Sequence, residues 1–250
     1  MTDTPPTPAP RRFNISSLFT ILFRPRKVFD ALTGEAKASW SVPLIAASLA
    51  VILVVIAGGM MKVRLAQTAL MTLPPDFQYW SPDMQQNYQQ AQQATVSPAL
   101  IYVLPLLGAL LALWLGWLIQ AGILHLGSTL LGGRGSMGSA LNVVAWAGVP
   151  FILRDVLRAV YVLAAGHPIQ SAGLSGFVTG TGMLYQLLAR VDVFLVWNIV
   201  LLVIGLHVAD GLPKGKAIAG GLVVVLILVL AQAGMAALGS GFGAALSGGG

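Results

Sequence analysis

Long apolar runs recur along this sequence, and they constrain the fold more than any other feature. A helix needs about 20 apolar residues to cross the ~30 Å hydrocarbon core of a bilayer, and the chain contains about five runs of that length. Of its 250 residues, 56% are hydrophobic and 9% are charged, whereas a soluble domain carries charge on about a quarter of its residues. The sequence therefore predicts an all-α fold, a polytopic transmembrane bundle.

The predicted spans differ in length. We place them at about residues 42–61, 99–131, 140–165, 183–208 and 217–238. The second would be roughly 50 Å long if it were continuous, well beyond the thickness of the bilayer core. We therefore expect it to tilt, to project into water, or to break near Gly108, Gly116 or Gly122.

The segments outside the spans have their own signatures. Residues 62–97 are polar, and Ser81-Pro82-Asp83 is typical of a helix start, which predicts a helical hairpin outside the membrane. Pro150 predicts a kink in the third span. Residues 1–13 lack the apolar surface needed for order and are interpreted as a disordered cytoplasmic tail, and the Gly-rich residues 239–250 as a second disordered tail.

Residues 14–37 mix apolar and cationic side chains and predict an interfacial amphipathic segment. Its apolar residues can enter the headgroup zone, while Arg24, Arg26 and Lys27 face anionic lipid. Pro25 should divide it into two short helices. Basic residues rather than small ones follow the first apolar run, so we interpret it as an uncleaved helix and not as a signal peptide.

The distribution of Lys and Arg predicts the orientation. The N-terminal segment and the turns at Arg134 and at Lys214 and Lys216 hold about nine of these residues, and the opposite side holds only Lys62 and Arg64. The N-terminus is therefore expected in the cytoplasm and the C-terminus outside. Such a protein would belong in a bacterial cytoplasmic (inner) membrane.

Charged residues inside the third and fourth spans form the main candidate site. These are Arg154, Asp155 and Arg158 in the third span and Arg190 and Asp192 in the fourth. An unpaired charge at such a depth costs at least about 2.5 kcal/mol, so the residues ought to be paired. We predict that Asp192 pairs with Arg158, and Arg190 with Asp155. The cluster is either a clamp that fixes the register of two helices, which its balanced charges favour, or a pathway for an ion or a lipid headgroup.

No catalytic group, metal site or cofactor is expected. The chain has no cysteine, and His125, His167 and His207 have no acidic or histidine companions at metal-ligand spacing. The net charge of +6 comes mostly from residues that flank the spans, which argues against a nucleic-acid partner. The sequence therefore predicts a protein that is not an enzyme.

The order of these features resembles the Yip (Ypt/Rab-interacting protein) domain family of five-span membrane proteins. The resemblance covers Asn14 to about Ala237. It is carried by the runs Ile21-Leu22-Phe23-Arg24-Pro25-Arg26-Lys27-Val28-Phe29 and Leu130-Leu131-Gly132-Gly133-Arg134-Gly135-Ser136, by Val149-Pro150, and by Val191-Asp192-Val193-Phe194-Leu195-Val196-Trp197 leading to Lys216-Ala217. The family topology that it implies has a cytoplasmic N-terminus and a luminal or external C-terminus.

Eukaryotic members of that family bind Rab-type small GTPases and act in vesicle traffic. This sequence lacks the Asp-Leu-Tyr-Gly-Pro motif of the eukaryotic branch and has no Tyr-rich motif in its third span, so it resembles the prokaryotic branch. The resemblance therefore does not imply that this protein binds a GTPase.

These observations lead to two hypotheses of function. The first is a membrane scaffold or adaptor that binds anionic lipid through its N-terminal segment and organises a membrane-protein partner or a second copy. The alternative is a small permease or channel subunit that uses the charge cluster as its polar lining. A hydrated cavity reaching the cluster would favour the permease, and a dry, fully paired cluster would favour the scaffold.

Overall fold

The computed structural model describes residues 15–33, 39–70, 74, 76–180 and 182–247, and all regular secondary structure in these ranges is helical. Four helices are long and apolar enough to cross a membrane, and one more apolar helix is shorter. The four are Ser41–Thr68, Ala99–Leu130, Met137–Ala165 and Lys214–Gly239, and the shorter one is Val193–Ala209. The prediction of an all-α polytopic bundle is confirmed. Residues 1–13, predicted to be a disordered tail, lie outside the described residues.

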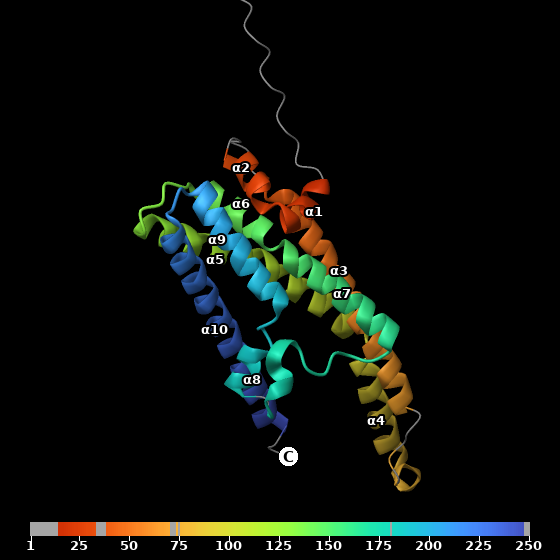
Figure 1. Ribbon diagram of the computed structural model, residues 1–250. Helices are drawn as coiled ribbons and strands as arrows, with labels where there is room; N and C mark the ends of the chain where they lie inside the picture. The colour runs from red at the N-terminus through yellow and green to blue at the C-terminus, as the bar shows by residue number, and fades with distance from the viewer. Residues whose placement is uncertain (1–14, 34–38, 71–73, 75, 181, 248–250) are drawn as a thin grey trace, which may run out of the picture.

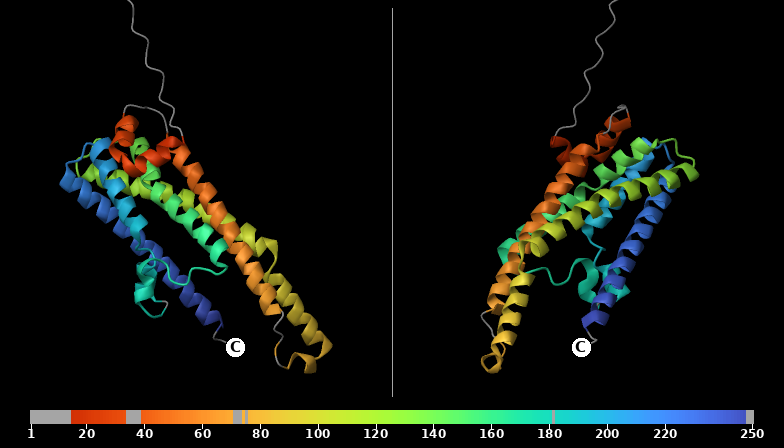
Figure 2. Two further views of the ribbon diagram at one scale, coloured as in Figure 1. Left: turned by 45° about the vertical axis from the view of Figure 1, so that its right-hand side comes forward. Right: turned by 180° about the vertical axis from the view of Figure 1, so that it is seen from behind.

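The first two passes are long helices that extend beyond the rest of the bundle. Helix α3 (Ser41–Leu70) continues past the predicted end of the first span, and α4 (Pro82–Thr95) begins at the predicted Ser-Pro-Asp start. A π-helical turn at Ala99–Val103 leads into α5 (Leu104–Leu130), which does not break at any of the three candidate glycines. Figure 2 shows that the lower part of α3 and α4 form a projecting helical hairpin.

The third and fourth passes are each broken into two helices. The third consists of α6 (Met137–Ala147) and α7 (Val149–Ala165), and the break falls at Gly148. The fourth consists of α8 (Met183–Leu188) and α9 (Val193–Ala209). The sequence analysis treated residues 183–208 as one helix, so the geometry assumed there for Arg190 and Asp192 is wrong.

The fifth pass, α10 (Lys214–Ser247), extends well beyond Leu238. The prediction of a disordered tail from Gly239 is therefore wrong as far as Ser247, and residues 248–250 lie outside the described residues. Alanines alternate with the glycines of this stretch, and alanine is the best helix former. Helices α10 and α3 lie on opposite sides of the molecule (Figures 1 and 2).

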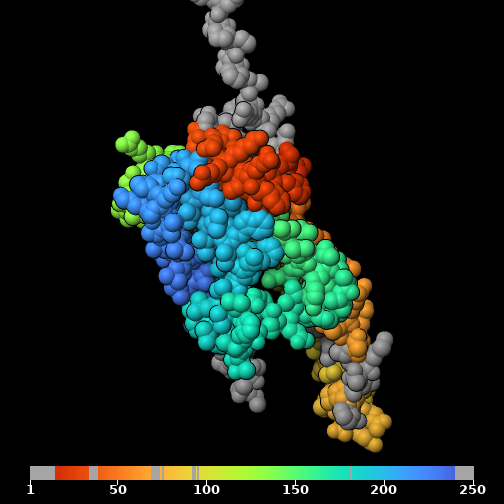
Figure 3. Space-filling model, in the orientation of Figure 1, coloured from red at the N-terminus to blue at the C-terminus, as the bar shows by residue number. Residues whose placement is uncertain are grey.

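The N-terminal segment forms two helices that cover the end of the bundle opposite the hairpin of α3 and α4 (Figure 3). Helix α1 (Ser16–Phe23) and helix α2 (Pro25–Thr33) meet at Pro25, as predicted. Helix α2 packs against α9 and α6, and the Phe29 ring is fully buried. Gly205 on α9 makes this possible, because a Cβ there would lie 2.5 Å from Val143 Cγ1 and 3.2 Å from the Phe29 ring. We call this the basic end, because α1, α2 and the turns that carry Arg134, Lys214 and Lys216 meet there.

Candidate functional site: a charged cavity between the spans

The five predicted charged residues lie on α7 and in the break between α8 and α9. Arg154, Asp155 and Arg158 belong to α7, and Arg190 and Asp192 lie between Leu188 and Val193. Arg154 is roughly 16 Å along the helix from Ala165, at 1.5 Å per residue. Charge from the third pass and charge from the fourth pass therefore meet well inside the bundle.

The ion pairs differ from those predicted. Arg154 is the shared partner: its Nε lies 3.3 Å from Asp155 Oδ1, and its Nη1 lies 3.6 Å from Asp192 Oδ2. Asp192 does reach the third pass, but through Arg154 and not through Arg158. The predicted pairs Asp192–Arg158 and Arg190–Asp155 are wrong, because one guanidinium takes both carboxylates.

The break before α9 explains why the predicted register failed. Asp192 is the N-cap of α9, and its Oδ1 accepts a hydrogen bond of 2.8 Å from Leu195 N. A short carboxylate at this position satisfies an amide that a helix start leaves unpaired, and its charge suits the positive end of the helix dipole. The same residue thus caps α9 through one oxygen and pairs with Arg154 through the other.

Arg190 is bound by carbonyl groups and by no carboxylate. Its guanidinium donates to the Gln186 backbone oxygen and Oε1, and its Nη2 donates to the Gln232 backbone oxygen at 3.1 Å. Among the described residues it has no ion-pair partner, and the same holds for Arg158. Arg154 is faced by two acids and Arg190 by none, so positive charge is left over on the Arg190 side of the cluster.

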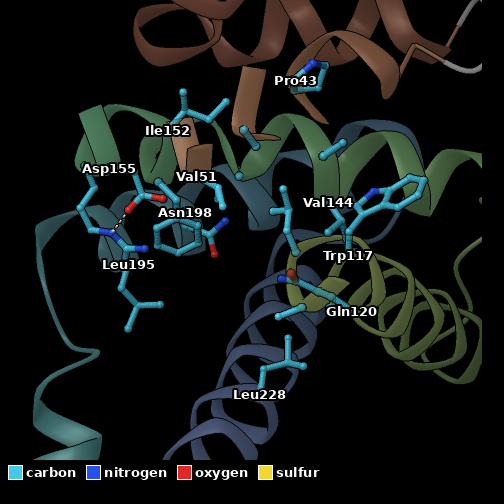
Figure 4. Close-up of a pocket in the computed structure, with 18 of the residues that line it drawn as sticks. Pro43, Val51, Trp117, Gln120, Val144, Ile152, Asp155, Leu195, Asn198 and Leu228 are labelled. Carbon is cyan, nitrogen blue, oxygen red and sulfur yellow. Dashed lines mark hydrogen bonds and ion pairs between the residues drawn. The ribbon is translucent and has the colours of Figure 1, made fainter. Parts of the chain in front are cut away.

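A cavity of about 300 Å³ reaches this cluster. Helices α3, α5, α6, α7, α9 and α10 contribute to its wall, and Arg154, Asp155 and Arg190 line one part of it. Figure 4 shows Asp155 at one side, with Val51, Ile152 and Leu228 among the apolar residues around the space. In the space-filling view the surface is hollowed between α7, in green, and the α8–α9 region, in cyan (Figure 3). Arg158 does not line the cavity.

Three amide side chains also line the cavity, and the sequence analysis missed them. They are Gln120 on α5, Asn198 on α9 and Gln232 on α10. Asn198 has a structural role, since its Nδ2 donates 2.7 Å to the Ala147 oxygen that the break in the third pass leaves without a helical partner. Lone Gln and Asn residues inside apolar runs were the sequence signal that could have found all three.

A second polar cluster lies at the basic end, and it is closed. We call it the Asp210 clasp. The Asp210 carboxylate accepts hydrogen bonds from Ser128 Oγ (2.5 Å) and Ser139 Oγ (3.1 Å), and Asp210 is 3% exposed. Its backbone oxygen accepts from Arg134 N at 3.0 Å. Gly135 has to be glycine here, because a Cβ would clash with the carboxylate. The sequence analysis did not single out Asp210.

The basic residues predicted to face the membrane surface are all exposed. Arg24 follows α1, and Arg26 and Lys27 lie in the first turn of α2. Beside them, Ile15, Phe19 and Phe23 are large apolar residues that remain exposed. Their spacing of four places them on one side of α1, away from the buried Ile21.

These observations define a class, the polytopic α-helical membrane proteins with a partly charged cavity among the spans. A family model described as the Yip1 domain matches residues 19–235, and the chain belongs to this family of membrane proteins. The resemblance seen in the sequence is confirmed. No curated protein and no solved structure matches the chain.

Proposed function

We propose that this protein is a non-enzymatic membrane scaffold that organises anionic lipid at the cytoplasmic surface of a bacterial inner membrane. The observation that carries the proposal is the exposed face of α1 and α2. Ile15, Phe19 and Phe23 form an apolar stripe beside three exposed cations. Apolar side chains in the headgroup zone with cations beside them are the combination that binds a helix to an anionic membrane surface.

The opposite face of the same segment makes this binding a property of the whole bundle. Ile21, Val28, Phe29 and Leu32 are buried in one apolar core with residues of α5, α6 and α9. A free amphipathic helix can leave the membrane without consequence for the rest of the chain. Here α1 and α2 are packed against the spans, so lipid bound to them is held at a fixed place beside the bundle.

The charge distribution supports a cytoplasmic location for the basic end. The turns that carry Arg134 and Lys216 lie together there, because Arg134 N donates to the Asp210 oxygen and Lys216 Nζ donates to the Leu131 oxygen. Lys62 and Arg64 lie on the part of α3 that leads into the hairpin. By the positive-inside rule the N-terminus is cytoplasmic and the hairpin and C-terminus are external.

We further propose that the scaffold acts as an adaptor, which binds a membrane-protein partner or a second copy of the chain through the hairpin. Rings of Phe77, Trp80 and Tyr88 contact one another, with centroids 5.4 to 5.6 Å apart, at the start of α4. Gln85 Nε2 donates to the Phe77 and Trp80 oxygens at 3.1 Å. These contacts give the projecting tip a defined shape, which a membrane-protein partner or a second copy could bind. GTPase binding forms no part of the proposal.

A fluorescence experiment tests the lipid-binding surface. The chain has no cysteine, so a single Ser16→Cys on α1 carries an environment-sensitive dye without background labelling. In vesicles of phosphatidylcholine mixed with phosphatidylglycerol the emission should shift to the blue relative to phosphatidylcholine alone, and salt should weaken the shift. The triple variant Arg24→Gln, Arg26→Gln, Lys27→Gln should lose it.

The matched control removes cations from the other end. Lys62→Gln with Arg64→Gln should leave the blue shift unchanged, because those residues lie far along α3 from α1. Equal emission in the two kinds of vesicle, or an equal loss in the control and in the triple variant, would contradict the proposal.

A permease or channel subunit is the second candidate, and the cavity is the observation that favours it. The cavity reaches Arg154, Asp155 and Arg190 in the middle of the bundle. A cavity that is open to water from one side is compatible with either function, whereas a transport route would be open to each side of the membrane in turn. Single Gln120→Cys in sealed vesicles tests this: labelling by an impermeant thiol reagent from both sides favours the permease, and labelling from one side only favours the scaffold.

A further inference from the structure

We infer that the cavity between α7, α9 and α10 is a binding site for one anionic phospholipid, whose phosphate pairs with Arg190 and whose acyl chains lie along the apolar wall. This site lies within the bundle and is independent of the surface formed by α1 and α2. The inference rests on the charge left unpaired beside the cavity, on the make-up of its wall, and on its opening between the helices.

The charge of the site selects an anion. Of the three charged residues in the wall, Arg154 and Asp155 pair with each other at 3.3 Å, and Asp192 lies 3.6 Å from the same arginine. Arg190 donates only to neutral oxygens of Gln186 and Gln232. A guanidinium has five N–H donors and matches the oxygens of a phosphate. Arg154 with its two carboxylates carries one net negative charge, so the phosphate is expected on the Arg190 side of the cavity. There an anionic ligand offsets a guanidinium that has no acidic partner among the described residues.

Neutral donors lie across the same space. The Gln120 amide lines the cavity and has no hydrogen-bond partner within the described part of the chain. An amide offers two N–H donors as well as an oxygen. Arg190 and Gln120 come from different passes, so a headgroup between them would be bound from two sides.

Most of the remaining wall is apolar, which favours a ligand with an apolar part over a simple hydrated anion. Its apolar residues include Val51 on α3, Leu113 on α5, and Val225, Leu228 and Val229 on α10. At about 300 Å³ the cavity is at the small end of the ~300–1,000 Å³ range of ligand sites. It can hold a headgroup and the first part of an acyl chain, and the remainder can lie along exposed apolar residues of α10 such as Leu222 and Leu226.

Native mass spectrometry tests the inference. The protein is kept in a neutral maltoside detergent, and phosphatidylglycerol or phosphatidylcholine is added. The background carries Arg24→Gln, Arg26→Gln and Lys27→Gln, which removes binding at the basic surface and separates this test from that of the proposed function. One phosphatidylglycerol should be retained per chain, with a preference of about tenfold over phosphatidylcholine. Both lipids offer a phosphate to Arg190, but only phosphatidylcholine also brings a choline cation close to that guanidinium, and the two like charges repel.

Two variants and one control locate the lipid. Arg190→Gln should abolish the tenfold preference. Gly116→Leu should weaken retention of both lipids. Gly116 lines the cavity and a Cβ there meets nothing within 4 Å, so the larger side chain has room to enter the space that the lipid would occupy. Arg158→Gln is the matched control, since Arg158 is on α7, lacks a described ion-pair partner and lies outside the wall. It should retain phosphatidylglycerol as the background does.

Three results would overturn the inference. The first is an unchanged preference in Arg190→Gln with the protein still folded by its melting temperature. The second is an equal loss in Arg158→Gln, which would mean a general effect of charge. The third is displacement of the lipid by inorganic phosphate alone, which would mean an anion site that needs no acyl chain.

Discussion

The Asp210 clasp and the charge cluster beside the cavity are both built around carboxylates inside the bundle, yet they differ in how completely those groups are satisfied. Asp210 is bound by two hydroxyls and is 3% exposed. Asp155 and Asp192 share one arginine and their side chains are each 18% exposed, while Arg190 has no acidic partner in the described part of the chain. A polar group whose bonds are complete within the fold stabilises it. One whose bonds are incomplete beside a cavity is available to a ligand.

The packing around the two regions differs in the same direction. At the basic end α2, α6 and α9 share one core, and Phe29 is fully buried in it. Near the charge cluster the third and fourth passes are both broken, and a cavity lies between the helices. The basic end is therefore expected to carry the stability of the fold, and the cavity to carry its binding function.

Phe29→Ala should have the largest effect on stability. Removing a fully buried ring leaves a cavity between α2 and α9, which costs about 3–5 kcal/mol of unfolding free energy. Phe23→Ala is the control, because Phe23 is 79% exposed and should change the free energy by less than about 0.5 kcal/mol. Denaturation in mixed micelles measures both. Equal values would mean that α2 lies on the surface without packing into the bundle.

Asp210→Ala should have the next largest effect, a loss of about 2–3 kcal/mol of unfolding free energy, because it leaves the Ser128 and Ser139 hydroxyls without their acceptor. The matched control is Asp83→Ala in the exposed first turn of α4, where the loss should stay below about 1 kcal/mol. A thermal melt of the detergent-solubilised protein distinguishes them. If Asp210→Ala has the same melting temperature as the wild type, the clasp does not stabilise the basic end.

Two substitutions of Asp192 separate its role as a helix cap from its role in the ion pair. Asp192→Asn keeps an oxygen for the Leu195 amide but loses the ion pair, which should lower the unfolding free energy by about 1 kcal/mol. Asp192→Ala loses the cap as well and should cost about 1 kcal/mol more. The result that contradicts the broken fourth pass is the reverse order, with alanine more stable than asparagine, because alanine favours a continuous helix.

Arg190→Gln should have the smallest effect on stability, within about 0.5 kcal/mol in neutral detergent, because it removes a charge that no acid compensates. Arg154→Gln at the same depth should cost about 2 kcal/mol, since it leaves two carboxylates without their partner. The same melting experiment compares them. Equal losses would mean that Arg190 is as firmly paired as Arg154.

The sequence predicted the features that follow from composition, such as the spans. It could not predict features that depend on which of two possible interactions a residue makes. Apolar runs of about 20 residues identify spans with little ambiguity, and Pro25 marked the boundary between α1 and α2. The broken fourth pass was missed because Asp192 can either pair across helices or cap a helix start, and the residue type alone does not decide between them. The structure brings Arg154, Asp155 and Asp192 of the predicted cluster together, and which acid faces Arg154 depends on that break.

The Asp210 clasp and the polar part of the cavity wall were missed in the sequence for a different reason. Ser128, Ser139 and Asp210 come from three segments that meet only once the helices pack. Gln120 and Gln232 are neutral, and a neutral amide in an apolar run carries a weaker signal than a charge. Contacts between distant segments leave no periodic pattern in the chain.

The most direct test of the account is whether the cavity is open to water while the basic end is closed. Three single-cysteine variants on α10 compare the water accessibility of the two regions in neutral-lipid nanodiscs. They are Gln232→Cys in the cavity wall, Ala217→Cys in the buried core, and Leu226→Cys on the exposed apolar side. A charged, water-soluble thiol reagent should label Gln232→Cys and leave the other two unlabelled until the protein unfolds. If Gln232→Cys is protected as fully as Ala217→Cys, the charge cluster is a closed clamp and the account is wrong.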